Sequence, residues 1–332
     1  MERVTALILI LCILLCGCKA EKTPEPKPET KGKIREESRA ESEHGEPQPQ
    51  SEKKDFVKWA EFNCSAELLK KASAADVRSE GEIDWITVLA YSVAKNWGNA
   101  DKKCLSYADE CIERLKKGGT EEDFSKELKL FDYYKEVYTA VLGGFLGIRN
   151  DETYGFKVYS PIADGFYFTH YKDFGASRSY GFSRPHKGND LLGTVGTPVI
   201  CIEDGYVEAL GWNQYGGWRI GIRSNDKKRY YYYAHLRKGH PFAKDLKEGD
   251  SVRAGQVIGY LGQTGYSTKP DANNISIPHL HFGMQLIFDE SQKDAVSEIW
   301  IDVYAIIELL NQSRSEVKYD KEAKEYYRVS VP

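Results

Sequence analysis

The pattern of apolar and polar positions divides the chain into segments that differ in composition and periodicity. Val4 to Leu15 is a short apolar run behind one basic residue, Arg3. Residues 19–55 contain no aromatic residue, hold five of the twelve prolines and mix Lys with Glu. Such a composition cannot bury enough apolar surface to offset the entropy of ordering. We therefore expect a leader at residues 1–17 and a disordered, Pro/Glu/Lys-rich tether at residues 18–55.

Between residues 56 and 150 the apolar residues recur every three or four positions, which predicts amphipathic helices. The stripes are Trp59, Phe62, Ala66 and Leu69; Ile83, Trp85, Ile86, Leu89, Ala90, Val93 and Trp97; Leu105, Ala108, Ile112 and Leu115; and Leu128, Phe131, Tyr134, Val137, Tyr138 and Val141. Gly118-Gly119 and Gly143-Gly144 close the last two stripes, as is typical of helix ends. We expect a small helical bundle with these side chains in its core.

From Phe156 onward, short apolar or alternating runs are broken by Gly and Pro, which is typical of strands. The expected strands are Thr197 to Ile202, Gly205 to Trp212, Trp218 to Arg223, Tyr230 to His235, Val257 to Leu261 and Leu280 to Phe288. A final helix is expected at Val303 to Leu310. The predicted fold class is therefore α+β and multidomain: an N-terminal helical bundle at residues 56–150, an antiparallel β-sheet domain at residues 151–312 and a charged C-terminal tail at residues 313–332.

Composition narrows the classes of function. The 332 residues are 41% hydrophobic and 29% charged, as in ordinary globular proteins. Lys+Arg number 46 against 50 Asp+Glu, a net charge of −4 without a basic stripe, so we expect no nucleic-acid partner. No apolar run reaches the roughly 20 residues that a membrane-spanning helix needs. No internal repeat of roughly 20 to 50 residues is present, which argues against solenoids and propellers.

The end of the leader carries a second signal. Leu15-Cys16-Gly17-Cys18 follows the apolar run directly. A small residue before Cys18, with Leu three positions before it, resembles the lipobox of bacterial lipoproteins. The resemblance implies a lipoprotein signal peptide that ends at Gly17, a lipid anchor on the Cys18 thiol and attachment to the cell membrane outside the cytoplasm. An ordinary cleaved signal peptide with incidental cysteines is the alternative.

Four cysteines remain after Cys18: Cys64, Cys104, Cys111 and Cys201. An even number permits disulfides in an exported protein. Cys104 and Cys111 are seven residues apart in an expected helix, a separation of roughly 10 Å, which is too far for a direct bridge. A bridge from Cys64 to one of them and four free thiols both stay open at this point.

Four of the seven histidines fall in three short patches of the expected β domain. The patches are His186-Lys187-Gly188-Asn189-Asp190, Tyr233-Ala234-His235-Leu236 and Pro278-His279-Leu280-His281-Phe282-Gly283. A lone histidine on a strand is usually a core residue. Two histidines at i and i+2 instead point to the same face of a strand, and Pro278 favours an extended residue before it. Such a pair suits a divalent metal, or one metal ligand beside a catalytic base.

These residues can form a metal-dependent hydrolase. A catalytic zinc ion takes three protein ligands and keeps one position open, and His186, Asp190 and one of the two histidines of the third patch supply three. The metal polarises a carbonyl and lowers the pKa of water, while the remaining neutral histidines accept a proton or stabilise an oxyanion. No His-Glu-x-x-His helix and no Gly-x-Ser-x-Gly turn is present, which argues against a helical zincin and a serine hydrolase.

The three patches together resemble a known family. His-x-x-x-Asp, a later isolated His and His-x-His occur in that order in the lysostaphin/LytM-type zinc metallopeptidases, which hydrolyse peptide bonds in bacterial peptidoglycan. The segments around the patches agree with this resemblance: Gly193 to Val199, Glu203 to Val207 and Gly249 to Gly259. The resemblance covers residues 156–290 and leaves the helical segment outside it.

The resemblance implies a role for each residue of the patches. His186, Asp190 and His281 are the implied ligands of one zinc ion, and His235 and His279 are the implied catalytic residues. Spacing alone does not choose between His279 and His281 as the third ligand. The implied fold is an antiparallel β core with the site in an open groove, and the implied substrate is a peptidoglycan peptide.

We therefore expect a zinc-dependent endopeptidase that takes part in cell-wall remodelling. Two alternatives belong to other classes of function. One is a zinc-containing but non-catalytic scaffold that regulates another wall enzyme, with the helical segment as its protein-binding part. The other is a wall-binding module that uses the groove only to hold peptide or glycan.

Overall fold

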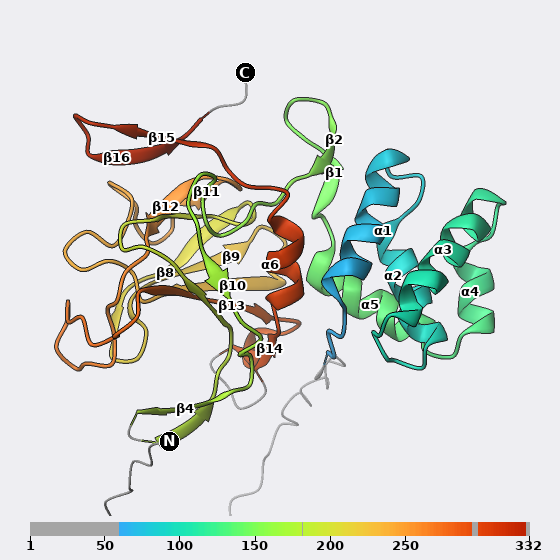
Figure 1. The fold of residues 1–332 in the computed structure, drawn as a ribbon, viewed down its shortest axis with the longest axis horizontal. Helices are drawn as coiled ribbons and strands as arrows, with labels where there is room; N and C mark the ends of the chain where they lie inside the picture. Colours follow the sequence, from blue (N-terminus) through green and yellow to red (C-terminus); the bar gives the residue numbers. More distant parts are fainter. Residues whose placement is uncertain (1–59, 181, 294–297, 330–332) are drawn as a thin grey trace, which may run out of the picture. The chain divides into compact units, whose positions relative to one another are not determined.

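The computed structural model describes residues 60–180, 182–293 and 298–329 (Figure 1). All of these residues belong to one compact unit, Lys54–Pro332. The expected signal peptide at residues 1–17, the tether at residues 18–55 and the lipidation site Cys18 lie outside the described residues. Within the described part, no helix is both long enough and apolar enough to cross a membrane.

The segment with helical periodicity folds into helices (Figure 1). They are α1 (Ala66–Arg78), α2 (Trp85–Lys95), α3 (Lys103–Lys116), α4 (Glu121–Glu127) and α5 (Phe131–Leu142). Ser65 begins α1 by accepting a hydrogen bond from the Leu68 N–H, and Asp84 begins α2 in the same way. α2 is buried along nearly its whole length and contacts α1, α3 and α5, so it forms the centre of this segment.

The helices and the β part share one hydrophobic core. α1 packs against α6 (Tyr304–Leu310), which lies in the stretch where the sequence predicts the final helix. Arg229 donates a hydrogen bond to the carbonyl oxygen of Ala140 on α5, 3.0 Å away. The buried apolar residues of the helices and of the sheet form one contiguous cluster. The boundary that the sequence predicts at residue 150 therefore falls inside one compact unit.

The β part is built on an antiparallel sheet with the strand order β11-β8-β9-β10-β13-β6-β3, and β14 pairs with β13. Its strands are β3 (Thr169–His170), β6 (Asn189–Leu192), β8 (Gly205–Asn213), β9 (Gly217–Ser224), β10 (Arg229–Ala234), β11 (Ser251–Val252), β13 (His279–Leu286) and β14 (Ile299–Ile301). Two-stranded pairs surround it: β1 (Leu146–Ile148) with β2 (Tyr154–Phe156), β4 (Ser177–Tyr180) with β5 (Phe182–Pro185), β7 (Pro198–Ile200) with β12 (Val257–Tyr260), and β15 (Val317–Asp320) with β16 (Glu325–Arg328). The predicted antiparallel architecture is thereby confirmed.

The register of the central strands brings the histidine patches together. β13 lies between β6 and β10, so that His281 is paired with Asp190 on one side and with Ala234 on the other. Leu280 and Phe282 on β13 are fully buried in the core. Because side chains alternate along a strand, His279 and His281 point to the opposite face of the sheet.

The end of the chain differs from the expected charged tail at residues 313–332. Residues 317–328 form the β15–β16 hairpin, and the Glu325 side chain is buried beside the Tyr260 hydroxyl, from which it accepts a hydrogen bond. The Arg328 guanidinium donates to the Ala254 carbonyl and to the Tyr159 hydroxyl, both at 2.6 Å. Charged composition alone predicted a tail because it does not reveal that these polar groups find partners on the β part.

Candidate metal centre

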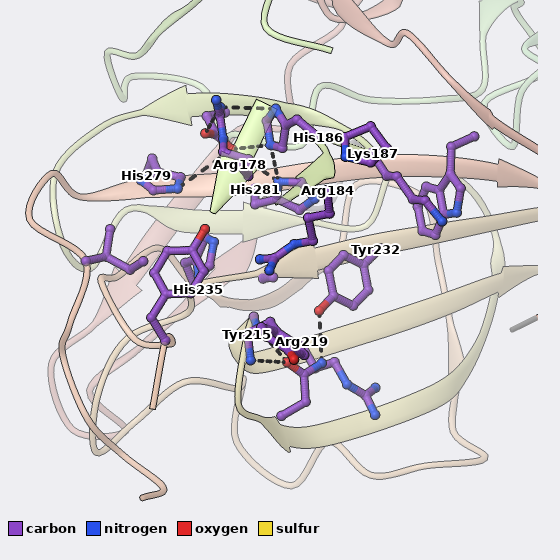
Figure 2. Close-up of a pocket in the computed structure, with 18 of the residues that line it drawn as sticks. Arg178, Arg184, His186, Lys187, Tyr215, Arg219, Tyr232, His235, His279 and His281 are labelled. Atoms are coloured by element: carbon purple, nitrogen blue, oxygen red, sulfur yellow. Dashed lines mark hydrogen bonds and ion pairs between the residues drawn. The ribbon is translucent and has the colours of Figure 1, made fainter. Parts of the chain in front are cut away.

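Two imidazoles and one carboxylate converge at the edge between β6 and β13 (Figure 2). His186 Nε2 lies 2.7 Å from His281 Nδ1 and 3.0 Å from Asp190 Oδ1. His281 Nδ1 lies 3.1 Å from the same carboxylate oxygen. All three ligand atoms thus fall within 4.8 Å of one another. Among the described residues, this is the set of His, Cys, Asp and Glu side chains that could hold a metal ion.

The main chain fixes the orientation of the His186 ring. Its Nδ1 lies 3.0 Å from the carbonyl oxygen of Asp173. A carbonyl can only accept a hydrogen bond, so Nδ1 carries a proton and Nε2 faces the cluster, where it can bind a metal once its own proton is displaced. This is the arrangement that orients histidine ligands in metal sites.

Arg178 on β4 holds the second oxygen of the carboxylate. Its guanidinium lies 3.1 Å from Asp190 Oδ2 and 2.9 Å from Asp173 Oδ2, which leaves Asp190 Oδ1 facing the histidines. Asp173 and Arg178 belong to no motif that the sequence shows. They reach the cluster through side-chain and carbonyl contacts to His186 and Asp190 across 12 or 13 positions of the chain, so no sequence signal could have identified them.

Two further histidines lie beside the cluster with the same hydrogen-bonding pattern. His235 Nδ1 is 2.8 Å from the Thr264 carbonyl, and His279 Nδ1 is 2.8 Å from the Ile277 carbonyl. Each Nδ1 must therefore donate, so Nε2 is the ring nitrogen left for other partners. His279 Nε2 is 3.7 Å from Asp190 Oδ1, and the rings of His235 and His279 are 4.8 Å apart. The sequence-predicted residues of all three patches thus meet in one place.

A strained stretch of backbone positions His235 just after β10. Its φ is +61°, a left-handed conformation that costs a non-glycine residue of order 1 kcal/mol or more. On the opposite side, Gly265 has a φ of +131°, and a Cβ there would lie 3.0 Å from His235 Nδ1. The glycine thereby lets the 264–265 backbone approach closely enough to bind the imidazole.

Burial and hydrogen bonds shift the pKa values of these groups in different directions. Burial would lower the pKa of His186, but hydrogen bonds to Asp173 and Asp190 outweigh it and raise the pKa to about 9. Burial also opposes the charged form of Asp190, yet hydrogen bonds from His186 and His281 hold its pKa well below the usual range. The cluster therefore stabilises one positive charge beside an ionised carboxylate. In contrast, burial lowers the pKa of His235 to about 3, helped by the nearby His279 and His281, so His235 is neutral at physiological pH.

The cluster opens into a groove of about 1010 Å³. Its walls come from the β4–β5 hairpin, from β8, β9 and β10, and from the loop that precedes β13. Tyr232 and Trp300 form an apolar wall next to the histidines, with the Tyr232 ring 5.8 Å from the His281 ring. A groove of this size accepts an extended peptide.

The other polar candidates of the sequence lie elsewhere. His170 pairs with Glu308 at 2.6 Å and His240 pairs with Glu325 at 2.7 Å, so both have structural partners. Cys64, Cys104, Cys111 and Cys201 are free cysteines. Burial raises the pKa of the Cys201 thiol, which disfavours the thiolate that a nucleophile needs.

The donor set fits zinc. Zinc binds imidazole nitrogen and carboxylate oxygen, and a catalytic site offers three such ligands with a fourth position open. Here two imidazole nitrogens and one carboxylate oxygen meet beside an open groove. The Asp173 carbonyl holds His186, and Arg178 holds Asp190. The antiparallel sheet thus carries a candidate site for one metal ion, with His235 and His279 beside it.

The stretch that holds the cluster is similar to known proteins. Residues 184–295 match the family model described as Peptidase family M23. His186, Asp190, His235, His279 and His281 all lie inside the matched stretch. The candidate metal ligands and the two neighbouring histidines therefore all belong to the stretch that matches this family.

Two curated relatives are similar over parts of the chain. The L-Ala–D-Glu endopeptidase of Bacillus subtilis (strain 168) is 36% identical over 201 residues, which are 56% of this chain and 58% of the relative. The glycyl-glycine endopeptidase ALE-1 of Staphylococcus capitis is 45% identical over 98 residues, 29% of this chain and 24% of the relative. The chain thus spans less than two thirds of either protein.

A solved structure supports the fold. The crystal structure of a candidate glycyl-glycine endopeptidase LytM from Ruminococcus gnavus ATCC 29149 aligns with a TM-score of 0.52 and 24% identity. The alignment covers 77% of this chain and 91% of that chain. An alignment over more than three quarters of this chain includes more than the matched M23 stretch.

Proposed function

We propose that this protein is a zinc-dependent endopeptidase that hydrolyses peptide bonds in bacterial peptidoglycan. One observation carries the proposal: His186, Asp190 and His281 converge beside His235 and His279, whose Nδ1 atoms are each held by a main-chain carbonyl. The relatives support the substrate, because the Bacillus and Staphylococcus proteins are named as endopeptidases, and the Peptidoglycan DD-endopeptidase ShyC of Vibrio cholerae is 27% identical over 228 residues.

Zinc would be held by His186 Nε2, by the Asp190 carboxylate and by His281 Nδ1. A zinc ion supplies a Lewis acid that polarises a substrate carbonyl and acidifies water. His279 Nε2 and His235 Nε2 lie on the open side, where each can accept a proton from the attacking water and return it to the leaving amine. Because burial keeps His235 neutral, its Nε2 is available as an acceptor throughout the physiological pH range.

The test uses the full-length chain with one equivalent of zinc and purified peptidoglycan of several cross-link types. Released fragments are identified by mass spectrometry. We expect new peptide termini with the parent protein and none with His281→Ala or His279→Ala. His240→Ala, whose histidine pairs with Glu325 outside the groove, serves as the matched control and should keep full activity. Full zinc occupancy without any released fragment would favour the non-catalytic scaffold, and retained wall binding in that case would favour the wall-binding module.

We also propose that the protein is lipid-anchored through Cys18 and acts outside the cytoplasm. The leader and the tether at residues 18–55 support this, because a tethered domain can reach a wall substrate from the membrane. Metabolic labelling with an alkyne fatty acid should mark the parent protein and leave Cys18→Ala unlabelled and released from membranes. Labelling that persists in Cys18→Ala would contradict the anchor.

A further inference from the structure

The groove beside the metal centre carries an excess of positive charge. Five cationic side chains line it, against two carboxylates, Asp190 and Glu298. The excess bears on which peptides the groove accepts. The inference that follows rests on the proposed endopeptidase function and concerns its choice of substrate.

Carboxylates of the protein pair with cations of this groove. Arg178 pairs with Asp173 and Asp190, Lys187 pairs with Glu298, and Lys293 pairs with Glu208. Arg184 stacks on two tyrosine rings of the groove, and Arg219 also lines it. Within residues 60–180, 182–293 and 298–329, no carboxylate lies at ion-pair distance from Arg219.

Arg219 lies on the same face of the sheet as the metal centre. Its neighbour Ile220 is fully buried in the core, so alternation along β9 directs Arg219 and Gly221 to the opposite face. Gly221 pairs with Tyr232 on β10, and the Tyr232 ring contacts the His281 ring. Two strand spacings, roughly 10 Å, separate β9 from β13. An extended peptide covers that distance with about three residues.

Arg184 reaches the same groove from β5. Its guanidinium stacks over the Tyr215 ring at 4.6 Å and lies 5.7 Å from the Tyr266 ring centre. Such stacking fixes the plane of the guanidinium and reduces the entropy lost when it binds a ligand. Figure 2 shows Arg184, Arg219 and Tyr232 around the pocket that also contains the histidines.

Tyr232 supplies a neutral donor in this part of the groove. Asn213 Nδ2 donates to the Tyr232 hydroxyl at 3.1 Å, so the phenol proton remains for another acceptor. The positive charges of Arg219 and Arg184 act on the Tyr232 oxygen, so the three groups share one part of the groove.

We propose that Arg219 and Arg184, together with the Tyr232 hydroxyl, bind a carboxylate of the substrate about three residues or fewer from the scissile bond. Guanidinium groups bind carboxylates with short, charge-assisted and often bidentate hydrogen bonds. The preferred substrate is then an acidic peptide, such as one with a free D-glutamate carboxylate, and not an uncharged glycine bridge. Both arginines act here as specificity-determining residues, separate from the metal cluster.

A matched pair of synthetic stem peptides tests this proposal on the full-length, zinc-loaded chain. The two peptides are identical except that the D-glutamate α-carboxylate is free in one and is an amide in the other. We expect kcat/KM to be roughly tenfold or more higher for the free acid. Arg219→Gln should remove this preference by slowing only the acid, and Arg219→Lys should restore part of it. Arg253→Gln, an exposed arginine outside this groove, should leave both rates unchanged.

The outcomes separate the two proposals. Equal rates on acid and amide, or an Arg219→Gln variant that slows both peptides alike, would overturn the carboxylate site and leave the endopeptidase function standing. If the parent cleaves neither these peptides nor whole peptidoglycan, the proposed function fails. The preference is then measured by calorimetric binding of both peptides to His279→Ala. Tighter binding of the acid, lost on adding Arg219→Gln, would still support the carboxylate site, and equal binding would overturn it.

Discussion

Gly188 lies directly against the ring of His281. A Cβ built on Gly188 would be 2.9 Å from both Cε1 and Nε2 of His281 and 2.6 Å from the Phe282 carbonyl oxygen. Contacts below 3.0 Å force a shift, and here one partner is backbone that cannot turn away. The glycine in the His-x-x-x-Asp motif therefore leaves room for the His-x-His motif, more than ninety residues later.

We expect Gly188→Ala to displace His281 and weaken zinc binding by roughly tenfold to a hundredfold, the range found when the support of a ligand is disturbed. A competitive zinc titration with a fluorescent chelator measures the change. Gly155→Ala is the matched control, because its Cβ would meet only Arg149 side-chain atoms at ordinary distances of 3.8 Å and more. Unchanged affinity in Gly188→Ala would refute this account of the glycine.

Zinc should stabilise the folded protein as well as activate it. A ligand at a hundred times its Kd adds about 2.7 kcal/mol to the free energy of unfolding. For a protein of this size that corresponds to several degrees in Tm, at about 2–4 °C per kcal/mol. Differential scanning fluorimetry with zinc and then with a chelator should show this rise and its reversal. Magnesium, which prefers octahedral oxygen ligands, should have no effect, and His281→Ala should lose the response to zinc.

The buried His235 predicts that the zinc-free protein loses stability in acid. Its pKa in the folded protein is about 3, below the ordinary value near 6.5. Below about pH 6.5 the unfolded chain therefore binds a proton at His235 that the folded protein does not bind. The contribution is therefore complete above pH 6.5 and is lost as the pH falls towards 3. Between pH 7 and pH 5 the loss is about 2 kcal/mol at most.

His235→Asn isolates this contribution, because Asn keeps a donor for the Thr264 carbonyl but does not titrate. Urea unfolding at pH 7 and pH 5 should show a smaller loss in the variant than in the parent. His186 contributes with the opposite sign, since its pKa is raised to about 9, but it does so in both proteins and cancels in the difference. Equal losses would show that His235 is not the group responsible.

Arg229 connects the sheet to the helices, and its removal should destabilise both. The guanidinium is buried, binds Glu203 at 2.7 and 2.9 Å, and donates to the Ala140 carbonyl on α5. Arg229→Met leaves the Glu203 carboxylate without this partner, which costs about 3–5 kcal/mol in comparable buried pairs. Urea unfolding measures the loss. Lys71→Met, which breaks an exposed pair with Asp109, should cost much less, and Arg229→Met/Glu203→Leu should recover part of the stability.

Much of the fold could be predicted because local patterns determine it. The apolar periodicity from Ala66 to Leu142 is that of the observed helices, and the alternating runs around Tyr230 to His235 and Leu280 to Phe288 are strands. The capping residues Ser65 and Asp84 act within one turn of the chain. Long-range partners were not predictable: the Arg229–Ala140 contact and the β15–β16 hairpin depend on where other segments lie.

In the candidate site, too, residues with a local sequence pattern could be predicted and long-range partners could not. Two histidines at i and i+2 on β13 carry a signal of their own, because strand geometry directs both to one face. Asp173 and Arg178 carry none, since a loop and a hairpin bring them to His186 and Asp190 from outside every motif. Spacing also could not choose between His279 and His281. In the structure His279 uses Nδ1 for the Ile277 carbonyl and His281 presents Nδ1 to the cluster, which supports the proposal of His281 as the third ligand.

The bonds from His235 and His279 to main-chain carbonyls affect how this domain can evolve. Every amino acid has the same main-chain carbonyl group. The residue at position 277, whose carbonyl orients His279, can therefore be replaced without losing this hydrogen bond. Ile277, which is 56% exposed, should accept almost any replacement in a saturation library. A deletion or insertion beside it should not be tolerated, because it would move the oxygen itself. The hydrogen bond that orients His279 therefore depends on the length and path of the loop before it. A sequence alignment, which compares side chains, would not reveal this requirement.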